Sequence, residues 1–358
     1  MIDEFALHRT RELVNVVRYF DDRHDTTLGK QPATLEEVTD EFYRSAIEIN
    51  EHLTPKLEQA IKNVCSRLKL QREVIHAFVN NSHEVQAACY YVGANTCLIR
   101  LTSALVNLLE PEEAEFVIAH EIGHFLLKHA PSGTANNSTE YFVFQRAKEI
   151  SADRIGLIGC GNIEIAGSAF IKTASGLGTR DINPDLKTYL RQIKQISANS
   201  RGENPFGTHP SMILRAYALD NFNEVMGNLA LESFNHDNVF QCDKQISEFF
   251  DKYSDTQVNA RVNEAKEDLK VWLAASMIVA DRRFTKDEQR IFEAKFGSAM
   301  LEKFKAYLST IEPDEIEDEI QQKLRSARNR LTNLIPTDAK NTEHILRKEL
   351  QMSFNPSV

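Results

Sequence analysis

The chain has 358 residues, a net charge of -10 and a hydrophobic content of 42%. This length predicts two or three domains, and the hydrophobic content is enough to form real cores. The negative charge argues against nucleic acid or an anionic membrane as a partner. No uncharged apolar run reaches the roughly 20 residues of a membrane-spanning helix, and the acidic start lacks the apolar segment of a signal peptide.

Along the chain, the sequence predicts helices first, then strands, and then helices again. Residues 1–53 are expected to form an N-terminal helical segment, and a further helix should follow Pro55. Between residues 73 and 101, β-branched and aromatic residues separated by polar turns predict two or three short strands. Helical patterns resume before Pro111 and continue, with polar loops between them.

The amino-acid composition changes near residues 235–240, where we expect a domain boundary. From about Asp237 the sequence is charged, mainly helical and nearly free of glycine. We therefore expect a second domain over 54–235 and a helical domain over 240–358. The predicted fold class is mainly α with a small β-sheet (α+β), followed by an all-α bundle.

The number and spacing of the cysteines bear on the cellular compartment of the protein. Five are scattered along the chain, and none forms a Cys-x-x-Cys pair. This pattern predicts reduced thiols in a cytoplasmic protein, and it argues against a disulfide framework or a cysteine zinc site.

The stretch "AHEIGHFLLKH" contains a histidine pair with metal-binding spacing. On a helix, His120 and His124 lie on one face, one turn apart, and both can reach a zinc ion at about 2.0–2.1 Å. Glu121 points beside the metal, where it can take a proton from a zinc-bound water. Gly123 costs about 1 kcal/mol in a helix relative to alanine, which makes sense if another backbone or a substrate passes close by.

A helix with two structural histidines is the alternative, because this motif fixes only three positions. His129 follows His124 by five residues, on a different helix face. We interpret it as a residue behind the ligands or at the surface, rather than as a ligand.

A catalytic zinc site needs a third protein ligand and one open position. A histidine six residues after the second is ruled out, because that residue is Ala130. Further along, Glu149 and Asp153 lie one turn apart on a second predicted helix. Glu149 can bind the metal, and Asp153 can accept the free ring N–H of a ligand histidine. The alternative for this pair is an ordinary exposed helix face.

The stretch "GTHPSMILR" offers two further candidates. His209 lies in a loop just before a helix, where an imidazole can donate a hydrogen bond to the oxyanion of a tetrahedral intermediate. Taken alone, it would be a surface histidine in a proline turn. Arg215 can anchor this loop to a carboxylate near the site, or lie in solvent.

Three stretches in this order, "EAEFVIAHEIGHFLLKH", "RAKEISADRIG" and "THPSMILR", resemble the gluzincin peptidases that include HtpX and the CAAX prenyl endoproteases. The resemblance implies a zincin-like metallopeptidase domain with one Zn²⁺ per chain, held by His120, His124 and Glu149. It also implies Glu121 as the general base and His209 as the transition-state donor. It also implies that Asp153 contacts a metal ligand without binding the metal itself.

The resemblance covers about residues 55–220 and implies a zinc-dependent endopeptidase. Its protein or peptide substrate would bind as an extended strand, paired with an edge strand supplied by residues 90–102. The transmembrane helices of the membrane members are missing, so no membrane span is expected. Residues 272–297 are similar to the TerB-like domain of tellurite-resistance proteins, although a general helical bundle that binds a protein partner fits equally well.

Two other functions compete with the peptidase. Glu121-x-x-His124 is also the ligand pair of di-iron bundles, but these need a second Glu-x-x-His on another helix. The sequence has no such pair in a stretch expected to be helical, because Glu73-x-x-His76 begins the region expected to form strands. The remaining alternative is a non-enzymatic or latent zinc-binding protein that acts through its helical domains.

Overall fold

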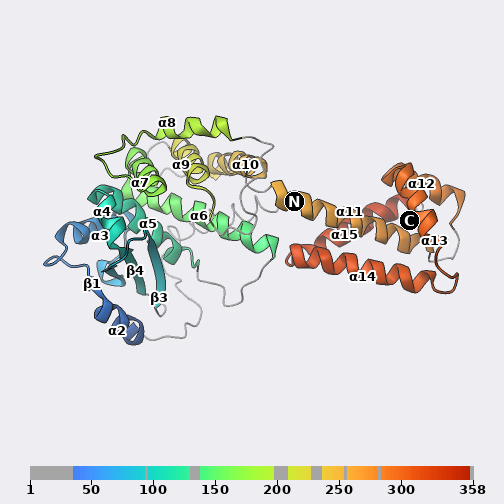
Figure 1. The fold of residues 1–358 in the computed structure, drawn as a ribbon, viewed down its shortest axis with the longest axis horizontal. Helices are drawn as coiled ribbons and strands as arrows, with labels where there is room; N and C mark the ends of the chain where they lie inside the picture. The colour runs from blue at the N-terminus through green and yellow to red at the C-terminus, as the bar shows by residue number, and fades with distance from the viewer. Residues whose placement is uncertain are drawn as a thin grey trace. The chain divides into compact units, whose positions relative to one another are not determined.

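The computed structural model describes residues 35–92, 96–129, 138–196, 209–226, 236–253, 256–279 and 284–354. Its described residues form two compact units. One contains residues 35–129 and 143–253, and the other contains 138–142 and 256–354. This described part is mostly helical with one small four-stranded sheet, which confirms the predicted α+β class (Figure 1).

The predicted N-terminal helical segment lies largely outside the described residues, because the description begins at residue 35. Its described end holds α2 (Leu35–Ser45) and a strand that the sequence did not predict, β1 (Ala46–Glu48). Helix α10 (His236–Tyr253) packs in the first unit, where the rings of Tyr217 and Phe249 stack at 3.9 Å. The chain thus passes from the first unit to the second after this helix, and the domain limits predicted from the sequence stay predictions.

The sheet has the order β1-β2-β4-β3. Strands β2 (Ile75–Asn80) and β4 (Thr96–Thr102) run parallel, and the other pairs are antiparallel. β3 (Ala87–Val92) therefore lies at one edge, and β4 lies inside. The stretch 90–102, expected as one edge strand, belongs to two strands, of which only β3 is at the edge.

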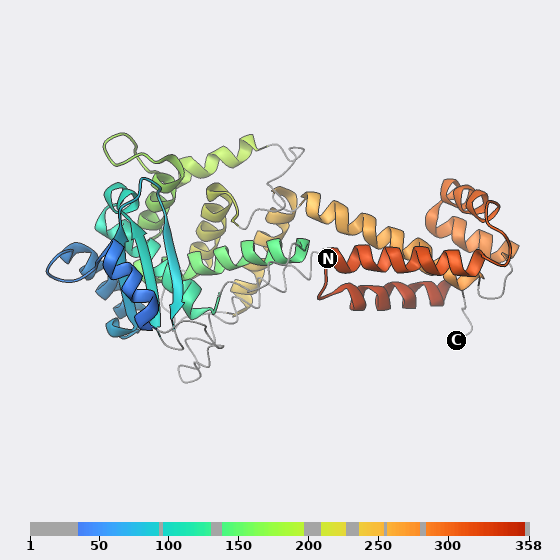
Figure 2. The ribbon, with the colours of Figure 1, turned by 60° about the horizontal axis from the view of Figure 1, so that its bottom comes forward.

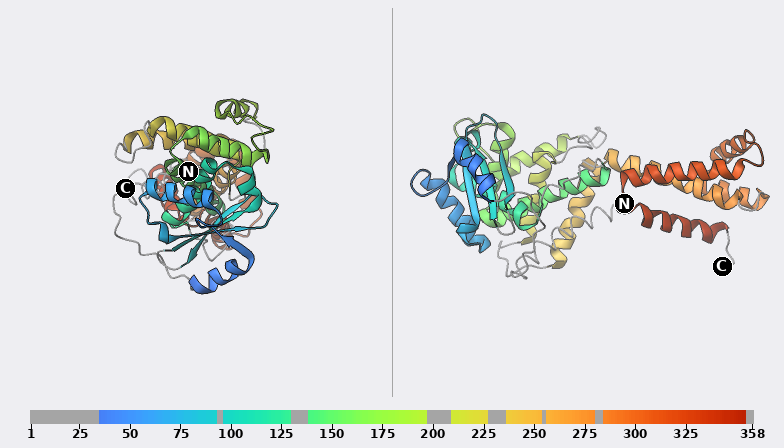
Figure 3. Two further views of the ribbon diagram at one scale, coloured as in Figure 1. Left: turned by 90° about the vertical axis from the view of Figure 1, so that its left-hand side faces the viewer. Right: turned by 90° about the horizontal axis from the view of Figure 1, so that it is seen from below.

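Helices cover both faces of this sheet (Figure 3). On one face α2 places the ring of Phe42 5.3 Å from that of Phe78. On the other face α3 (Pro55–Leu68) and α5 (Pro111–Leu126) bury alternate strand residues such as Ile75 and Cys97. This alternation follows from strand geometry, because successive side chains point to opposite faces.

The start of α5 is fixed by its own capping residues and by a neighbouring helix. Glu110 and Glu113 form a capping box, in which the Glu113 carboxylate accepts the Glu110 N–H at 2.8 Å. The same carboxylate accepts a hydrogen bond from the buried ammonium of Lys172 at 2.7 Å. Lys172 belongs to α7 (Ile163–Ser175), so this ion pair ties α5 to α7.

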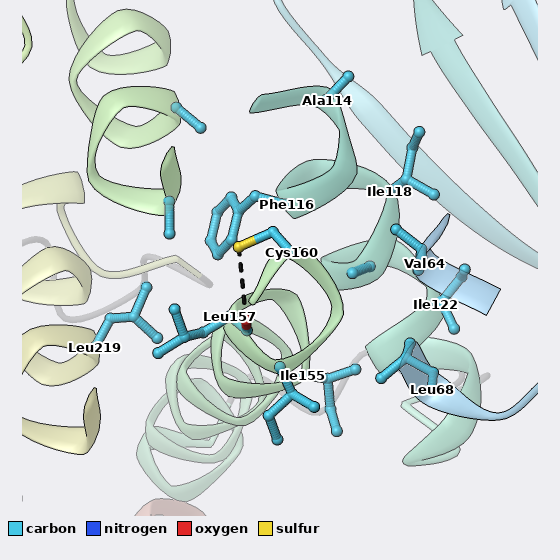
Figure 4. Close-up of a cluster of buried hydrophobic side chains, with 14 of the residues drawn as sticks. Val64, Leu68, Ala114, Phe116, Ile118, Ile122, Ile155, Leu157, Cys160 and Leu219 are labelled. Atoms are coloured by element: carbon cyan, nitrogen blue, oxygen red, sulfur yellow. Dashed lines mark hydrogen bonds between the residues drawn. The ribbon is translucent and has the colours of Figure 1, made fainter. Parts of the chain in front are cut away.

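Further helices belong wholly or mainly to the first unit. They are α4 (Ser103–Leu108), α6 (Thr139–Cys160), α8 (Leu186–Leu190) and α9 (Met212–Met226). Figure 2 shows the long helix α6 beside the sheet, and Figure 4 shows apolar side chains of α5, α6 and α9 meeting in one cluster.

Helices α5 and α6 approach very closely, because glycines lie where they meet. A Cβ at Gly159 would come 2.3 Å from the Cβ of Ala119, and one at Gly156 would come 2.8 Å from the Phe116 ring. At Gly123, a Cβ would lie 3.2 Å from the backbone of Ala152. The expectation that another backbone passes close to Gly123 is therefore confirmed.

The second unit is helical throughout its described part. Its helices are α11 (Thr256–Ile278), α12 (Lys286–Phe296), α13 (Ser298–Leu308), α14 (Ile316–Leu334) and α15 (Ala339–Phe354). Helices α11, α14 and α15 run alongside one another, and α12 and α13 lie at one end (Figures 1 and 2). Each helix in the described residues is too short or too polar to span a bilayer.

We predict that Gly159→Ala destabilises the first unit although alanine favours helices, because the added methyl group collides with Ala119. The free energy of unfolding should fall by about 1–3 kcal/mol, the usual cost of overpacking. Gly178→Ala is the control, since nothing lies within 4 Å of that position. Thermal unfolding of both variants measures the difference, and equal melting temperatures would contradict the close packing of α5 and α6.

Candidate metal centre

The contact between α5 and α6 brings three possible ligands together. His120 and His124 lie one turn apart on α5, with their Nε2 atoms 3.1 Å apart. The Glu149 carboxylate of α6 faces both, at 3.7 Å from His120 Nε2 and 3.5 Å from His124 Nε2. Among the described residues, these three form a group whose ligand atoms all lie within 4.8 Å of one another.

The spacing of this group fits a tetrahedral zinc ion. Ligand atoms that are each about 2.0–2.1 Å from such an ion lie about 3.3 Å from one another. The two Nε2 atoms, 3.1 Å apart, lie close to that value. The nearest Glu149 oxygens, Oε2 to His120 and Oε1 to His124, lie at 3.7 and 3.5 Å. Two imidazoles and one carboxylate are also a ligand set that zinc hydrolases use, with the fourth position left for water or substrate.

Asp153 holds the first histidine in its metal-binding orientation. Its Oδ1 lies 2.9 Å from His120 Nδ1, and the carboxyl group is almost fully buried. His120 therefore donates its Nδ1–H to Asp153 and keeps Nε2 free to bind a metal ion. The predicted contact between Asp153 and a ligand histidine is thus present in the structure.

Arg215 binds both carboxylates of α6. Its guanidinium donates to Asp153 at 2.6 and 2.8 Å, and Nη1 lies 3.2 Å from the Glu149 carboxylate. The side chain is 11% exposed, so the solvated alternative for Arg215 is wrong. Because Arg215 lies on α9, these contacts tie the start of α9 to the two carboxylates of α6.

The charges around Glu149 keep it ionised. Burial alone would raise its pKa, but the Arg215 charge and the His209 hydrogen bond outweigh burial and hold the pKa well below its usual range. Burial and the neighbouring His120 lower the pKa of His124, so this imidazole stays neutral. An ionised carboxylate and a neutral imidazole are the forms that bind a metal ion.

Glu121 is buried beside the ligands and is not among them. Its side chain belongs to the same helix turn and is 8% exposed. Burial raises its pKa, while His120 opposes the shift and Glu149 adds to it. A carboxyl group whose pKa is moved toward neutrality can both accept and return a proton, as a general base must.

His209 lies at the rim of the site. Its Nδ1 is 3.1 Å from the Glu149 carboxylate, and its side chain is 64% exposed. The residue precedes α9 in an irregular segment, as predicted. Its other ring nitrogen is thus available to a substrate.

His129 contacts the second histidine, which corrects the surface alternative given for it. It is 8% exposed, and its Nδ1 lies 2.9 Å from His124 Nδ1. Helix α5 ends at Leu126, and Lys128 takes a left-handed conformation with φ of 56°. The chain then turns back in a Schellman motif, in which the His129 N–H donates to the His124 carbonyl oxygen at 2.9 Å.

Comparison with known proteins identifies part of the chain. Residues 51–144 match the model of Peptidase family M48. The match includes His120, Glu121 and His124, and it ends five residues before Glu149. No curated protein and no solved structure matches the chain. The TerB-like resemblance of the C-terminal helices is not supported by these comparisons.

The matched residues and the geometry agree on the kind of domain. The family match covers α3, the strands β2, β3 and β4, and the whole of α5, and the following helix α6 supplies the carboxylate that faces the two histidines. Residues 51–144 are therefore similar to peptidase family M48, and His120, His124 and Glu149 form a group that could hold a metal ion.

Proposed function

We propose that the chain is a zinc-dependent endopeptidase with one Zn²⁺ per chain. The observation that carries this proposal is the convergence of His120, His124 and Glu149 at the spacing of zinc ligands, with buried Glu121 beside them. A zinc ion held there would lower the pKa of bound water to about 7 and would polarise the carbonyl group of the substrate.

The residues around the ligands have separate roles in this proposal. Glu121 takes the proton of the attacking water and later returns it to the leaving amine. His209 donates an N–H to the substrate oxygen as negative charge develops on it. Arg215 and Asp153 keep Glu149 ionised and His120 correctly oriented.

The substrate is proposed to be a protein or peptide that binds as an extended strand. Strand β3 is at the edge of the sheet and packs beside α5, so its outer backbone groups can pair with such a strand. We also propose that the helical unit from residue 256 binds a protein partner. A cytoplasmic location rests on the cysteine pattern alone.

Replacing the third ligand should weaken zinc binding severely. Loss of a residue that only contacts a metal ligand weakens metal affinity by roughly 10–100-fold. Glu149 is a proposed ligand itself, so we expect Glu149→Ala to weaken zinc affinity by more than this. Peptide hydrolysis should be lost as well. Glu112→Ala, which removes an exposed carboxylate at the start of α5, is the control. Zinc that stays bound at one ion per chain after chelator dialysis would show that another residue is the ligand.

Removing only the base should leave the metal bound. Glu121→Gln keeps the size and shape of the side chain, so zinc content and melting temperature should stay near those of the wild type. The kcat for peptide hydrolysis should fall by about 10²–10⁴, equivalent to roughly 2.7–5.4 kcal/mol of transition-state stabilisation. Hydrolysis within about threefold of the wild-type rate, far less than loss of a general base costs, would contradict this role.

The His129 contact predicts a graded effect on zinc affinity. If His124 binds zinc through Nε2, its Nδ1–H donates to His129 Nδ1. His129→Phe removes the acceptor and should weaken zinc binding by about 10–100-fold. In His129→Asn, the amide oxygen can take the place of Nδ1, so affinity should be largely restored. Competition with a chelator measures both constants, and equal losses in the two variants would assign His129 a packing role only.

A latent or non-enzymatic zinc protein remains the second candidate. Both candidates predict one zinc ion per chain and loss of that zinc in Glu149→Ala. They differ in hydrolysis of an unfolded protein such as casein, which only the peptidase cleaves and which Glu121→Gln should abolish. Two iron ions per chain would favour the di-iron alternative instead.

A further inference from the structure

Two cysteine side chains touch on the sheet beneath α5. Cys89 lies on β3 and Cys97 on β4, and their Sγ atoms are 3.6 Å apart. In the β3–β4 register Cys89 is opposite Ile99, and Cys97 is opposite Tyr91. The two cysteines are therefore diagonal neighbours on one face of an antiparallel pair.

The two thiols differ in their access to solvent. Cys97 is fully buried, and Cys89 is partly exposed on the edge strand. The carboxylate of Glu121 and the backbone of Phe125 are close enough to act on the Cys89 thiol. Cys89 is thus the less buried of the two residues, and it lies next to the helix that carries the proposed general base.

We propose that Cys89 and Cys97 form a reversible thiol–disulfide pair that responds to peroxides. The Cys89 thiolate attacks one oxygen of hydrogen peroxide, which breaks the O–O bond and gives a sulfenic acid and water. The Cys97 thiolate then attacks the Cys89 sulfur, the S–S bond forms, and the hydroxyl group leaves as a second water. The two thiols lose two electrons and two protons in total, and one peroxide molecule is reduced.

The geometry indicates a slow reaction and an easily reduced product. The hydrogen bond to Cys97 and burial raise the pKa of Cys89, so little thiolate is present at neutral pH. Diagonal residues have Cα atoms about 7–8 Å apart, whereas disulfides usually span about 4.4–6.8 Å. The bond therefore has to draw β3 and β4 out of their resting geometry, which is typical of labile, regulatory disulfides.

This movement would act on the edge to which a substrate strand binds, a consequence that rests on the proposed peptidase function. Strand β3 packs against α5, and the Cys89 side chain lies near Glu121. Oxidation should therefore slow peptide hydrolysis, and reduction should restore it.

The sequence allows a direct test of the bond. Residues 73–100 contain no lysine or arginine before Arg100, so trypsin releases both cysteines in one peptide that has no other cysteine. The full chain loaded with zinc is treated with hydrogen peroxide, its remaining thiols are alkylated after denaturation, and it is digested. We expect this peptide to lose the mass of two hydrogen atoms, to carry no alkyl group, and to regain both thiols after treatment with a phosphine reductant.

Matched variants separate the pair from the other cysteines. Cys89→Ser should block the bond, and Cys160→Ala, which removes a buried thiol elsewhere, should leave it unchanged. Cys65 also lies near Cys97, but its tryptic peptide is separate, so a Cys65–Cys97 bond would appear as two linked peptides. That result, or full alkylation of both cysteines after oxidation, would overturn the proposal.

Hydrolysis is measured on the same samples. The oxidised wild-type chain should be slower and should recover on reduction, while Cys89→Ser should be insensitive to the same treatment. An unchanged rate in a sample whose peptide shows the disulfide would overturn the regulatory part alone. If even the reduced chain cleaves no substrate, the peptidase proposal fails. The mass of the tryptic peptide then still decides whether Cys89 and Cys97 form a disulfide.

Discussion

The close approach of α5 and α6 is the constraint on which the metal centre depends. Glu149 lies on the same stripe of α6 as Ala152, Gly156 and Gly159, since these residues follow one another at intervals of three and four. The small residues let the two backbones approach, and the carboxylate one turn before them then faces the histidines of α5. Larger side chains at these glycines would separate the helices and move the third ligand away from the first two.

The charges of the site form a second constraint. A buried carboxylate without a partner costs several kcal/mol, and here two carboxylates, Glu149 and Asp153, are buried together. The guanidinium of Arg215 contacts both carboxylates, and it also ties α9 to α6. Asp153 in turn orients His120, so one network fixes the ionisation of one ligand and the tautomer of another.

The parts of the site that depend on helix periodicity could be predicted from the sequence, and the parts that depend on chain reversals could not. The i, i+4 spacing places His120 with His124, and Glu149 with Asp153, whatever the rest of the fold. A continuing helix would put His129 on another face, whereas the left-handed Lys128 turns it back onto His124. β1 was missed because its pairing with β2 joins Ala46 to Asn80, far apart in sequence.

The most direct test of this account is anomalous diffraction at the zinc absorption edge from crystals of the zinc-loaded full chain. The account predicts one strong peak per chain between α5 and α6. The peak should lie about 2.0–2.2 Å from His120 Nε2, His124 Nε2 and a Glu149 oxygen, with Glu121 close by and not bound. A peak held by other residues, or a peak that lacks Glu149 as a ligand, would contradict it.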